Sequence, residues 1–322
     1  MICNDILEAV GNTPLIKLNK LTAGLGADIY AKVEYFNPGG SIKDRVAVNI
    51  IKQAEKEGLI NADTTIIEAT AGNTGMGLAL AAATRGYKCI FVMPDKMSCD
   101  KINLLEALGA KVVITPTNVA PDSEYSYNSV ADKLSKKIRD SFRPNQFLNM
   151  NNPQAHYNST GPEIFKDTEG LIDVLVVGVG TGGTITGAGG YLKEKKPSLK
   201  IVVADPQGSI LSGGKAGCWK VEGIGEDFFP DTFNKDLVDE YIKVSDQESF
   251  SITRKLAKQE GLLVGGSSGT ALAAAIKYAK KVDKKEMIVV VMPDTGRNYL
   301  SKIFSDSWMS NNDFSVDDSD EI

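Results

Sequence analysis

The sequence predicts an α/β fold with two α/β domains, each built on a mostly parallel sheet. Three observations support this. Short apolar runs rich in β-branched residues recur along the 322 residues, and they alternate poorly between apolar and polar, as strands buried on both faces do. Segments of helical period lie between most of these runs. A polar stretch at 116–152 divides the runs into two groups, which fits two domains in a chain of this length.

The order of these runs gives the expected elements. The expected strands are 28–33, 64–68, 88–93, 111–115, 174–179, 200–204 and 287–292. The expected helices are 42–57, 75–85, 102–108, 129–142, 185–195 and 269–282. We place the domain junction near Gln146 and expect a smaller, mobile domain at 45–146. The larger domain then consists of 1–44 plus 147–310, and the acidic segment 311–322 is expected to be a disordered tail.

The overall composition argues against several classes of partner. The chain has 36 Lys+Arg and 41 Asp+Glu, a net charge of −5, whereas nucleic-acid and anionic-membrane binding need a basic face. No apolar stretch approaches the ~18 to 20 residues that span a bilayer, and the N-terminus lacks the basic region of a signal peptide. The four cysteines form neither a CxxC nor a zinc spacing. We therefore expect a cytoplasmic protein with reduced thiols.

The only histidine, His156, limits the chemistry available to one chain. A multi-histidine metal site cannot be built from it, and no metal site is expected. A Ser-His-Asp triad would have to use this one residue, for which a hydrogen-bonded structural role is expected instead. The chemistry then rests on lysine, carboxylates, backbone amides or a bound cofactor.

The first motif is NPGGSIKDR, Asn37 to Arg45. A helical pattern begins directly after its two glycines, and Ser41 with Asp44 fits a capping box. Lys43 is therefore expected in the first turn of a helix. The positive end of the helix dipole should lower the pKa of Lys43, which makes the nucleophilic neutral amine more accessible. The alternative is a surface lysine after a glycine-rich turn.

Two further motifs lie where a helix is expected to begin. TAGNTG, Thr70 to Gly75, follows the expected strand 64–68, and α/β sheets bind ligands at the carboxyl ends of strands. Its small residues expose backbone N–H groups that suit a carboxylate or phosphate. The alternative is an ordinary turn between strand and helix. GGSSGT, Gly265 to Thr270, opens an alanine-rich helix and could present Ser267, but alone it is a weak signal.

The fourth motif is VGVGTGGT, Val177 to Thr184. Its glycines and threonines can surround a phosphate with backbone amides and hydroxyls. Gly178, Gly180 and Gly183 also match GxGxxG, and Asp205 closes a later strand, which is the fingerprint of a dinucleotide fold. This segment leaves open whether the ligand is a simple phosphoester or the dinucleotide of an NAD-dependent dehydrogenase.

Taken together, the motifs resemble those of one family. GNTPL (11–15), NPGGSIKDR, AGNTG, GTGGT, EGIG (222–225) and GGSSG follow one another along the chain. The sequence resembles the cysteine synthase / cystathionine β-synthase family of fold-type-II pyridoxal-phosphate enzymes, whose α/β fold is tryptophan-synthase-β-like. The resemblance runs from about Ile6 to Met309, and it implies that GxGxxG here is a phosphate cup.

The resemblance also implies roles for individual residues. Lys43 is expected to form the internal Schiff base with pyridoxal 5′-phosphate and to remove the Cα proton, and Asp227 is the second candidate catalytic residue. Asn73 should bind the ring oxygen of the cofactor, and Ser267 should face its pyridine nitrogen. The residues expected to hold the phosphate are Gly180, Thr181, Gly182, Gly183 and Thr184. The residues expected to bind the substrate are Thr70, Ala71, Gly72, Thr74, Gln146 and Gly223.

Several stretches, such as EGIGEDF, are nearer the cystathionine β-synthase branch. The resemblance then implies β-replacement, in which serine or cysteine reacts with homocysteine to give cystathionine and water or hydrogen sulfide. One alternative is a cysteine lyase that releases hydrogen sulfide and forms serine or lanthionine. A second is cysteine synthesis from O-acetylserine and sulfide, and a third is a non-catalytic binding protein that keeps the fold. A haem segment and regulatory domains are not expected, and a homodimer is.

Two departures from the family pattern bear on the substrate. Ala71 stands where the family usually has serine, so one hydroxyl that can contact the substrate is lost. Glu226 precedes Asp227 where the family often has a neutral residue. Two carboxylates would repel an anionic sulfide, and they could orient a cationic amine or activate a water. The alternative is that Glu226 points to solvent.

Overall fold

The computed structural model describes residues 2–70, 72–95, 97, 99–120, 122–282 and 285–316. The chain forms two compact units. Unit 1 consists of Met1–Gly11 and Asn37–Ala155, and unit 2 of Asn12–Phe36 and His156–Ile322. The boundaries between the two units therefore lie at other positions than the predicted domain boundaries, which follow residues 44 and 146.

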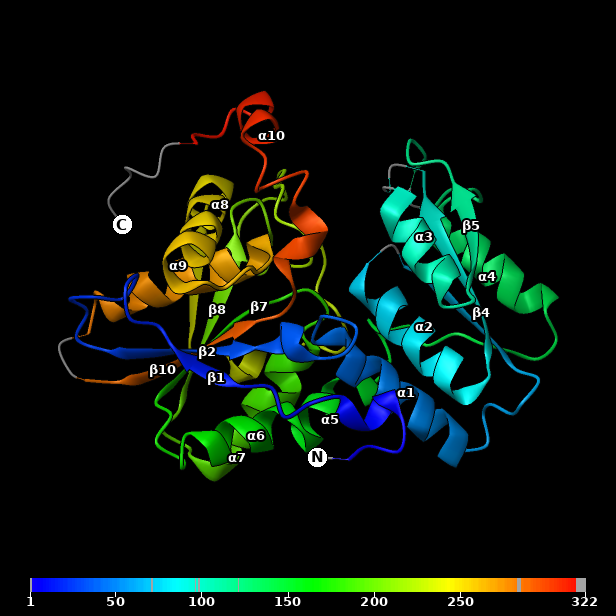
Figure 1. The fold of residues 1–322 in the computed structure, drawn as a ribbon, viewed down its shortest axis with the longest axis horizontal. Coiled ribbons are helices and arrows are strands. Elements are labelled where there is room, and N and C mark those ends of the chain that lie inside the picture. The colour runs from blue at the N-terminus through cyan, green and yellow to red at the C-terminus, as the bar shows by residue number, and fades with distance from the viewer. Residues whose placement is uncertain are drawn as a thin grey trace. The chain divides into compact units, whose positions relative to one another are not determined.

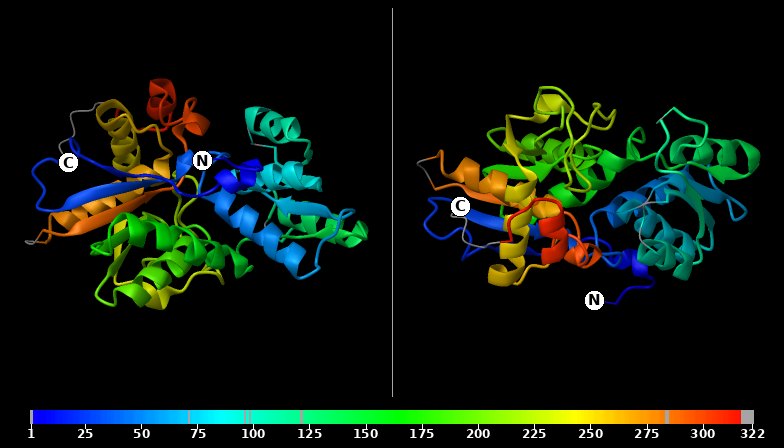
Figure 2. Two further views of the ribbon diagram at one scale, coloured as in Figure 1. Left: turned by 60° about the horizontal axis from the view of Figure 1, so that its bottom comes forward. Right: turned by 90° about the horizontal axis from the view of Figure 1, so that it is seen from above.

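Unit 2 is built on a six-stranded sheet with the order β1-β2-β10-β7-β8-β9. Its strands are β1 (Leu15–Lys17), β2 (Asp28–Val33), β7 (Val174–Gly178), β8 (Lys200–Pro206), β9 (Glu240–Val244) and β10 (Met287–Met292). Only β1 runs antiparallel to its neighbour. Strands β2 and β10 are far apart in the sequence but lie side by side, with Asp28 opposite Met287 (Figure 2). The inner strands of such a parallel sheet are covered on both faces by helices, in keeping with their continuous apolar runs.

Helices cover both faces of this sheet. Helices α8 (Asp246–Lys255) and α9 (Gly266–Ala279) lie on one face, and α6 (Thr160–Asp167) and α7 (Gly190–Lys195) on the other (Figure 1). Helix α8 begins at a capping box formed by Ser245 and Glu248, which satisfies backbone donors of its first turn. The remaining helical segments are α5 (Asn151–Asn158), α10 (Asp306–Asn311), η2 (Glu34–Phe36), η3 (Ile185–Gly189), η4 (Lys235–Leu237), η5 (Leu256–Glu260) and η6 (Gly296–Tyr299).

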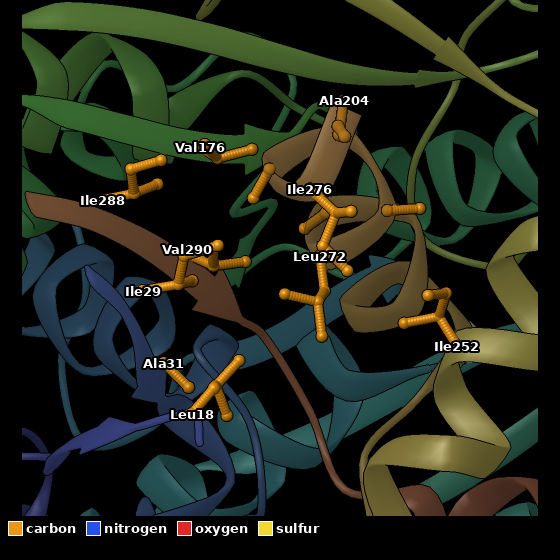
Figure 3. Close-up of a cluster of buried hydrophobic side chains, with 14 of the residues drawn as sticks. Leu18, Ile29, Ala31, Val176, Ala204, Ile252, Leu272, Ile276, Ile288 and Val290 are labelled. Atoms are coloured by element: carbon orange, nitrogen blue, oxygen red, sulfur yellow. The ribbon is translucent and has the colours of Figure 1, made fainter. Parts of the chain in front are cut away.

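The main core of unit 2 lies between the sheet and helix α9. Val176, Ile288 and Val290 point from neighbouring strands toward Leu272 and Ile276 of the helix (Figure 3). All five side chains are at most 2% exposed. This packing fixes the start of α9, and with it Ser267, relative to the sheet.

Unit 1 has a parallel four-stranded sheet with the order β5-β4-β3-β6. Its strands are β3 (Thr65–Ala69), β4 (Lys88–Pro94), β5 (Lys111–Thr115) and β6 (Ser141–Phe142), and its helices are α1 (Lys43–Lys56), α2 (Asn73–Arg85), α3 (Cys99–Ala107) and α4 (Tyr127–Lys137), with a short η1 (Ile6–Ala9). Ile66, Phe91 and Met93 pack on one face with residues of α1 and α2. Ile67 and Val92 pack on the other with α4.

The predicted fold class, two α/β units with mostly parallel sheets, is confirmed. Every expected strand and helix has a counterpart, and 28–33, 111–115 and 287–292 match β2, β5 and β10 at both ends. The expected helix 129–142 ends early, because the chain turns extended at Ile138 and residues 141–142 pair with β3 instead.

The segment predicted to be a disordered tail begins differently in the structure. Phe314 stacks on Trp308 and meets Phe250 edge to face, and the backbone N–H of Ser315 donates to Gln247. Residues 311–316 are therefore packed against unit 2, whereas 317–322 lie outside the described residues. Within the part of the chain that the structure describes, no helix is both long and apolar enough to cross a membrane.

Candidate functional site

The sequence motifs follow the carboxyl ends of parallel strands in both units. Thr70–Gly75 follows β3 in unit 1, and the glycine-rich loop Gly180–Thr184 follows β7 in unit 2. Parallel strands end at one edge of a sheet, which is where open α/β sheets bind ligands. Some of the predicted site residues belong to unit 1, and the others belong to unit 2.

Lys43 is the first residue of α1 and is half-buried. The Oγ of Ser41 accepts its backbone N–H at 3.2 Å. Asp44 accepts the N–H of Gly39 at 2.6 Å, two positions earlier than a capping box uses, so the predicted capping box takes a different form. A methyl group on Gly77 would lie 3.0 Å from the carbonyl oxygen of Lys43. Helices α1 and α2 therefore meet closely at the lysine.

The predicted substrate-binding residues of unit 1 gather at the start of α2. Asn73 and Thr74 are its first two residues, where backbone N–H groups have no partner within the helix. The hydroxyl of Thr74 donates to Oε1 of Gln146 at 2.7 Å, so the structure joins the two segments that the sequence named separately. The hydroxyl of Thr70 accepts the N–H of Gly72 at 3.5 Å. Ala71 lies outside the described residues.

Beside this group lies a carboxylate that the sequence reasoning missed. Glu68 of β3 is 4% exposed. Burial raises the pKa of Glu68, against the opposing effects of Arg143 and of backbone N–H donors from Asn145 and Ala69. The signal was present in the sequence, because a charged residue inside the apolar run TIIEA needs a partner once it is buried.

The loop Gly180–Thr184 of unit 2 is shaped by a second loop, residues 223–233, that packs against it. A methyl group on Gly180 would lie 2.5 Å from the carbonyl oxygen of Gly223, and one on Gly182 would overlap Phe233. Gly182 also has a φ of +81°, which disfavours any side chain. The hydroxyl of Thr232 donates to the carbonyl of Thr181 at 2.5 Å. The contacts from the second loop hold a cradle of backbone amides of the kind that binds phosphate.

The first residue of the acidic pair in the EGIGED segment, Glu226, lies next to this cradle. Oε1 of Glu226 is 3.9 Å from the position of a methyl group on Gly180, and the residue is half-buried. The backbone N–H of Glu226 donates to Ser209, whose hydroxyl in turn donates to the carbonyl of Glu226, both at 3.2 Å. Glu226 therefore lies beside the glycine loop, in contrast to the alternative that it points to solvent, and Asp227 is exposed.

Ser267 is the second residue of α9 and is 6% exposed. Gly265 at the N-cap leaves no room for a side chain, because one would overlap Asp294 and approach Tyr299. The hydroxyl of Tyr299 donates to Asp294 at 2.8 Å. Burial, and then the Asp294 carboxylate, raise the pKa of Tyr299 well above its ordinary value. This buried pair fixes the turn that presents Ser267.

His156 is fully buried and bonded on both sides. Its Nδ1 lies 2.9 Å from the hydroxyl of Thr160, and its Nε2 lies 3.4 Å from the hydroxyl of Thr184. The hydrogen-bonded role predicted for this residue agrees with the structure. The sequence did not indicate that its partner belongs to the predicted phosphate loop.

The carboxylate that completed the dinucleotide fingerprint is not placed to bind a ribose. Asp205 is 1% exposed, and its Oδ2 accepts the backbone N–H of Ser212 at 2.9 Å. A dinucleotide site needs this acid to reach the ribose hydroxyls of a bound ligand. The structure therefore favours the simple phosphate cup.

In each unit, taken by itself, the predicted residues suit a part of pyridoxal 5′-phosphate. The cradle of Gly180–Thr184 supplies neutral amides and hydroxyls for the phosphate. Ser267 supplies a neutral hydroxyl at a helix start, and Lys43 supplies a primary amine in a first turn. Among the described residues, no group of three or more His, Cys, Asp or Glu is arranged to hold a metal ion.

Comparison with known proteins agrees with this fit. The chain is 52% identical over 320 residues to cystathionine β-synthase of Apis mellifera, a match that covers 97% of this chain and 64% of the relative. It is 48% identical over 316 residues to cystathionine β-synthase of Mus musculus, covering 96% of this chain and 56% of the relative. The chain thus spans about three fifths of the length of these curated relatives.

Two solved structures match over almost their whole length. A hydrogen sulfide-producing enzyme from Fusobacterium nucleatum has a TM-score of 0.87 and 40% identity, covering 92% of this chain and 98% of that one. An O-acetylserine dependent cystathionine β-synthase from Helicobacter pylori has a TM-score of 0.87 and 42% identity, covering 94% and 98%. A family model described as pyridoxal-phosphate dependent enzyme matches residues 6–294. The chain therefore belongs to the family of pyridoxal-phosphate dependent enzymes, whose cofactor is pyridoxal 5′-phosphate.

Proposed function

We propose that this chain catalyses β-replacement on a small amino acid in sulfur amino-acid metabolism, in the manner of a cystathionine β-synthase. The observation that carries the proposal is the cradle of Gly180–Thr184, in which Gly180 and Gly182 leave no room for a side chain. Proteins named cystathionine β-synthase, 42–52% identical to this chain, support the same reaction class. The proposed substrates are serine or cysteine as donor and homocysteine as acceptor.

The cofactor, when bound, supplies the electron sink for the charge that develops when the Cα proton leaves. Lys43 is proposed to attach it and, once released, to take the proton from Cα of the amino acid. Asn73 and Ser267 are proposed to hold its ring, and residues 180–184 its phosphate. Ser267 is a neutral partner, which does not force the ring nitrogen to carry a proton.

The substrate carboxylate is proposed to bind at the start of α2. Helix N-termini present N–H donors and a positive dipole end to anions, and Thr70, Gly72 and Thr74 lie there. The hydroxyl of Thr74 bonds Gln146 at 2.7 Å, which brings the Gln146 side chain to the same place. Ala71 and Gly223 complete the proposed substrate-binding set.

In the proposed reaction, the bond between Cβ and the leaving group breaks after the Cα proton has gone. Water leaves when the donor is serine, and hydrogen sulfide when it is cysteine. The thiol of homocysteine then forms the new C–S bond, its proton is released, and a proton returns to Cα, which gives cystathionine. Plain cysteine synthesis would use O-acetylserine and sulfide and release acetate.

One observation favours a second candidate, release of hydrogen sulfide from cysteine with water or another cysteine as acceptor. The Glu226 carboxylate lies beside Gly180, and Asp227, the next residue in the chain, is exposed. Carboxylates repel a sulfide anion and can accept a proton from water or a thiol. If this pair activates the acceptor, Asp227→Asn should cut hydrogen sulfide release from cysteine at least tenfold. Unchanged release would remove the candidate.

The deciding experiment identifies products by mass spectrometry. Three donors are tested: serine, O-acetylserine and cysteine. Each donor is incubated alone, then with homocysteine, and then with sulfide. We expect cystathionine from serine or cysteine with homocysteine. Acetate and cysteine as the dominant products would replace the proposal with cysteine synthesis, and no product from any pair would favour a binding protein.

Lys43→Ala tests the proposed catalytic residue, with Lys52→Ala as its control because Lys52 is an exposed residue of the same helix. Lys43→Ala should lose the visible absorbance that borohydride abolishes in the parent, and with it all product. Lys52→Ala should keep both. Product formation by Lys43→Ala at the parent rate would overturn the assignment.

The proposal includes a homodimer in the cytoplasm. The resemblance supports the dimer, and sedimentation equilibrium would measure it. All four cysteines are free, and Cys3, Cys99 and Cys218 are exposed, as expected where thiols stay reduced. Fractionation of the source cells would test the location.

A further inference from the structure

The carboxylate of Glu68 lies where the parallel pairing of β3 and β6 stops. The two strands pair at Thr65 with Ser141 and at Ile66 with Phe142. Beyond Phe142 the second strand reaches Pro144, which has no backbone N–H and so cannot continue a ladder. The two segments nevertheless stay joined beyond this point, because the side chain of Glu68 replaces the backbone hydrogen bonds between them.

Beyond this point, the side chain of Glu68 accepts hydrogen bonds from the backbone of both segments. Its Oε2 accepts the N–H of Asn145 at 2.6 Å, and its Oε1 accepts the N–H of Ala69 at 3.1 Å. The Nη2 of Arg143 lies 3.5 Å from Oε1. One carboxylate thus holds together the continuations of two neighbouring strands.

Each of these continuations leads directly into the proposed carboxylate site. Ala69 precedes Thr70, and Asn145 precedes Gln146, whose side chain receives the hydroxyl of Thr74 at 2.7 Å. Asn145 adopts a φ of +45°, which non-glycine residues rarely adopt and which the surroundings must maintain. Leu148 and Asn149 both donate to its carbonyl, at 3.1 and 3.0 Å.

A carboxylate is the side chain that suits this position. Both of its oxygens are acceptors, so it can receive two N–H groups, whereas an amide has one acceptor and would face the second N–H with a donor. Burying a charge is costly unless it is hydrogen-bonded and paired. The two N–H groups and Arg143 offset part of that cost for a residue that is 4% exposed, although burial still raises the pKa of Glu68.

We propose that Glu68 is a positioning residue that sets the distance between Gln146 and the Thr70–Thr74 loop, and through it the affinity for the amino-acid carboxylate. The inference rests on the proposed function, because that function assigns the carboxylate to this loop. Glu68 acts through its neighbours and takes no part in the chemical step.

The test is Glu68→Gln, with Glu55→Gln as its control. Glu55 lies in the same unit, where its carboxylate accepts the hydroxyl of Tyr87 at 3.0 Å at the surface. In Glu68→Gln the KM for the amino acid should rise about tenfold, the effect of losing one hydrogen bond to a charged group. The KM for the thiol, the cofactor affinity and kcat should stay within twofold of the parent, and Glu55→Gln should match the parent throughout.

A second measurement separates this inference from the proposed function. Hydrogen–deuterium exchange of the peptide covering residues 143–149 should be faster in Glu68→Gln than in Glu55→Gln, and this holds whether or not the protein turns over any substrate. If exchange is faster in Glu68→Gln but the parent forms no product, the proposed function is wrong and the role of Glu68 stands. The role of Glu68 would be overturned if both the exchange and the amino-acid KM were unchanged in Glu68→Gln. It would also be overturned if the KM values for the amino acid and for the thiol rose equally.

Should Glu68→Gln not fold, Arg143→Gln serves instead. It removes the cation opposite Glu68 from a side chain that is 18% exposed, and it leaves the carboxylate in place. The same two readouts apply, with a smaller rise in the amino-acid KM of about threefold, since Arg143 lies 3.5 Å from the carboxylate and also pairs with Asp132. No change in either readout would count against the proposal.

Discussion

At the scale of single residues, His156 connects helix α6 to the loop Gly180–Thr184, the proposed phosphate cradle. Its ring lies between the hydroxyls of Thr160 and Thr184, and a neutral imidazole has one donor and one acceptor nitrogen for such a chain. The lone histidine thus contacts the loop that we propose to hold the cofactor phosphate, and we assign it no part in the chemical step.

We predict that His156→Leu weakens binding of pyridoxal 5′-phosphate about tenfold. Leucine keeps most of the volume but leaves the buried hydroxyl of Thr160 and the half-buried hydroxyl of Thr184 without this partner, which costs about 1–3 kcal/mol. The measurement is titration of cofactor-free protein, followed by visible absorbance.

Thr160→Val is the matched control for His156→Leu. It removes the hydroxyl far from the cradle and keeps the bond between His156 and Thr184. It should lose stability but bind the cofactor within threefold of the parent. Equal loss of affinity in the two variants would mean that His156 acts only on folding.

At the scale of elements, the cradle depends on a backbone that only glycine permits. Gly182 has a φ of +81°, and a methyl group there would overlap Phe233. The loop then enters the π-turn η3 (Ile185–Gly189), a conformation common at functional sites. Two constraints, torsional and steric, thus act on one residue.

Gly182→Ala should therefore abolish cofactor binding at concentrations that saturate the parent. Gly261→Ala is the control, because Gly261 has a φ of +72° with open space around its Cα. The control carries the torsional cost alone, about 1 kcal/mol, and should bind the cofactor normally. Urea unfolding and cofactor titration measure the two effects, and normal binding by Gly182→Ala would show that the cradle tolerates the displacement.

Elements with a strong apolar period could be predicted from the sequence, and others could not. Strands β2, β5 and β10 match the expected bounds. Strand β9, EYIKV, was missed because the charged residues Glu240 and Lys243 interrupt its apolar residues, and it lies at the edge of the sheet. Strands β1 and β6 have three and two residues, too few to show a period.

The site shows the same division. Residues within one motif, such as Lys43 and the Gly180–Thr184 loop, could be named because each motif is local in sequence. The contacts of Glu68 with Asn145, Glu226 with Gly180 and His156 with Thr184 join segments far apart in the chain. They depend on strand order and loop packing, which no local pattern encodes.

At the scale of the whole molecule, the four thiols report on unfolding. Cys3, Cys99 and Cys218 are exposed, and Cys89 is buried in β4. Burial raises the pKa of Cys89 to about 11, whereas a thiol in an unfolded chain titrates near ~8.5. In the native protein three thiols should react quickly with an aromatic disulfide at pH 8, and the fourth only on unfolding.

The same shift makes stability fall at alkaline pH. Below about pH 8.5 the thiol is protonated in both states, so the burial is without electrostatic cost. Between about 8.5 and 11 the native state binds more protons than the unfolded state, and the free energy of unfolding decreases by at most ~1.4 kcal/mol per pH unit. Cys89→Ala lacks this titration. It should start less stable because of the cavity that it leaves, and the gap to the parent should narrow from pH 8 to pH 10 in urea unfolding. A gap that stays constant over that range would mean that Cys89 ionises in the native protein as easily as in the unfolded chain, and that its site is open to water.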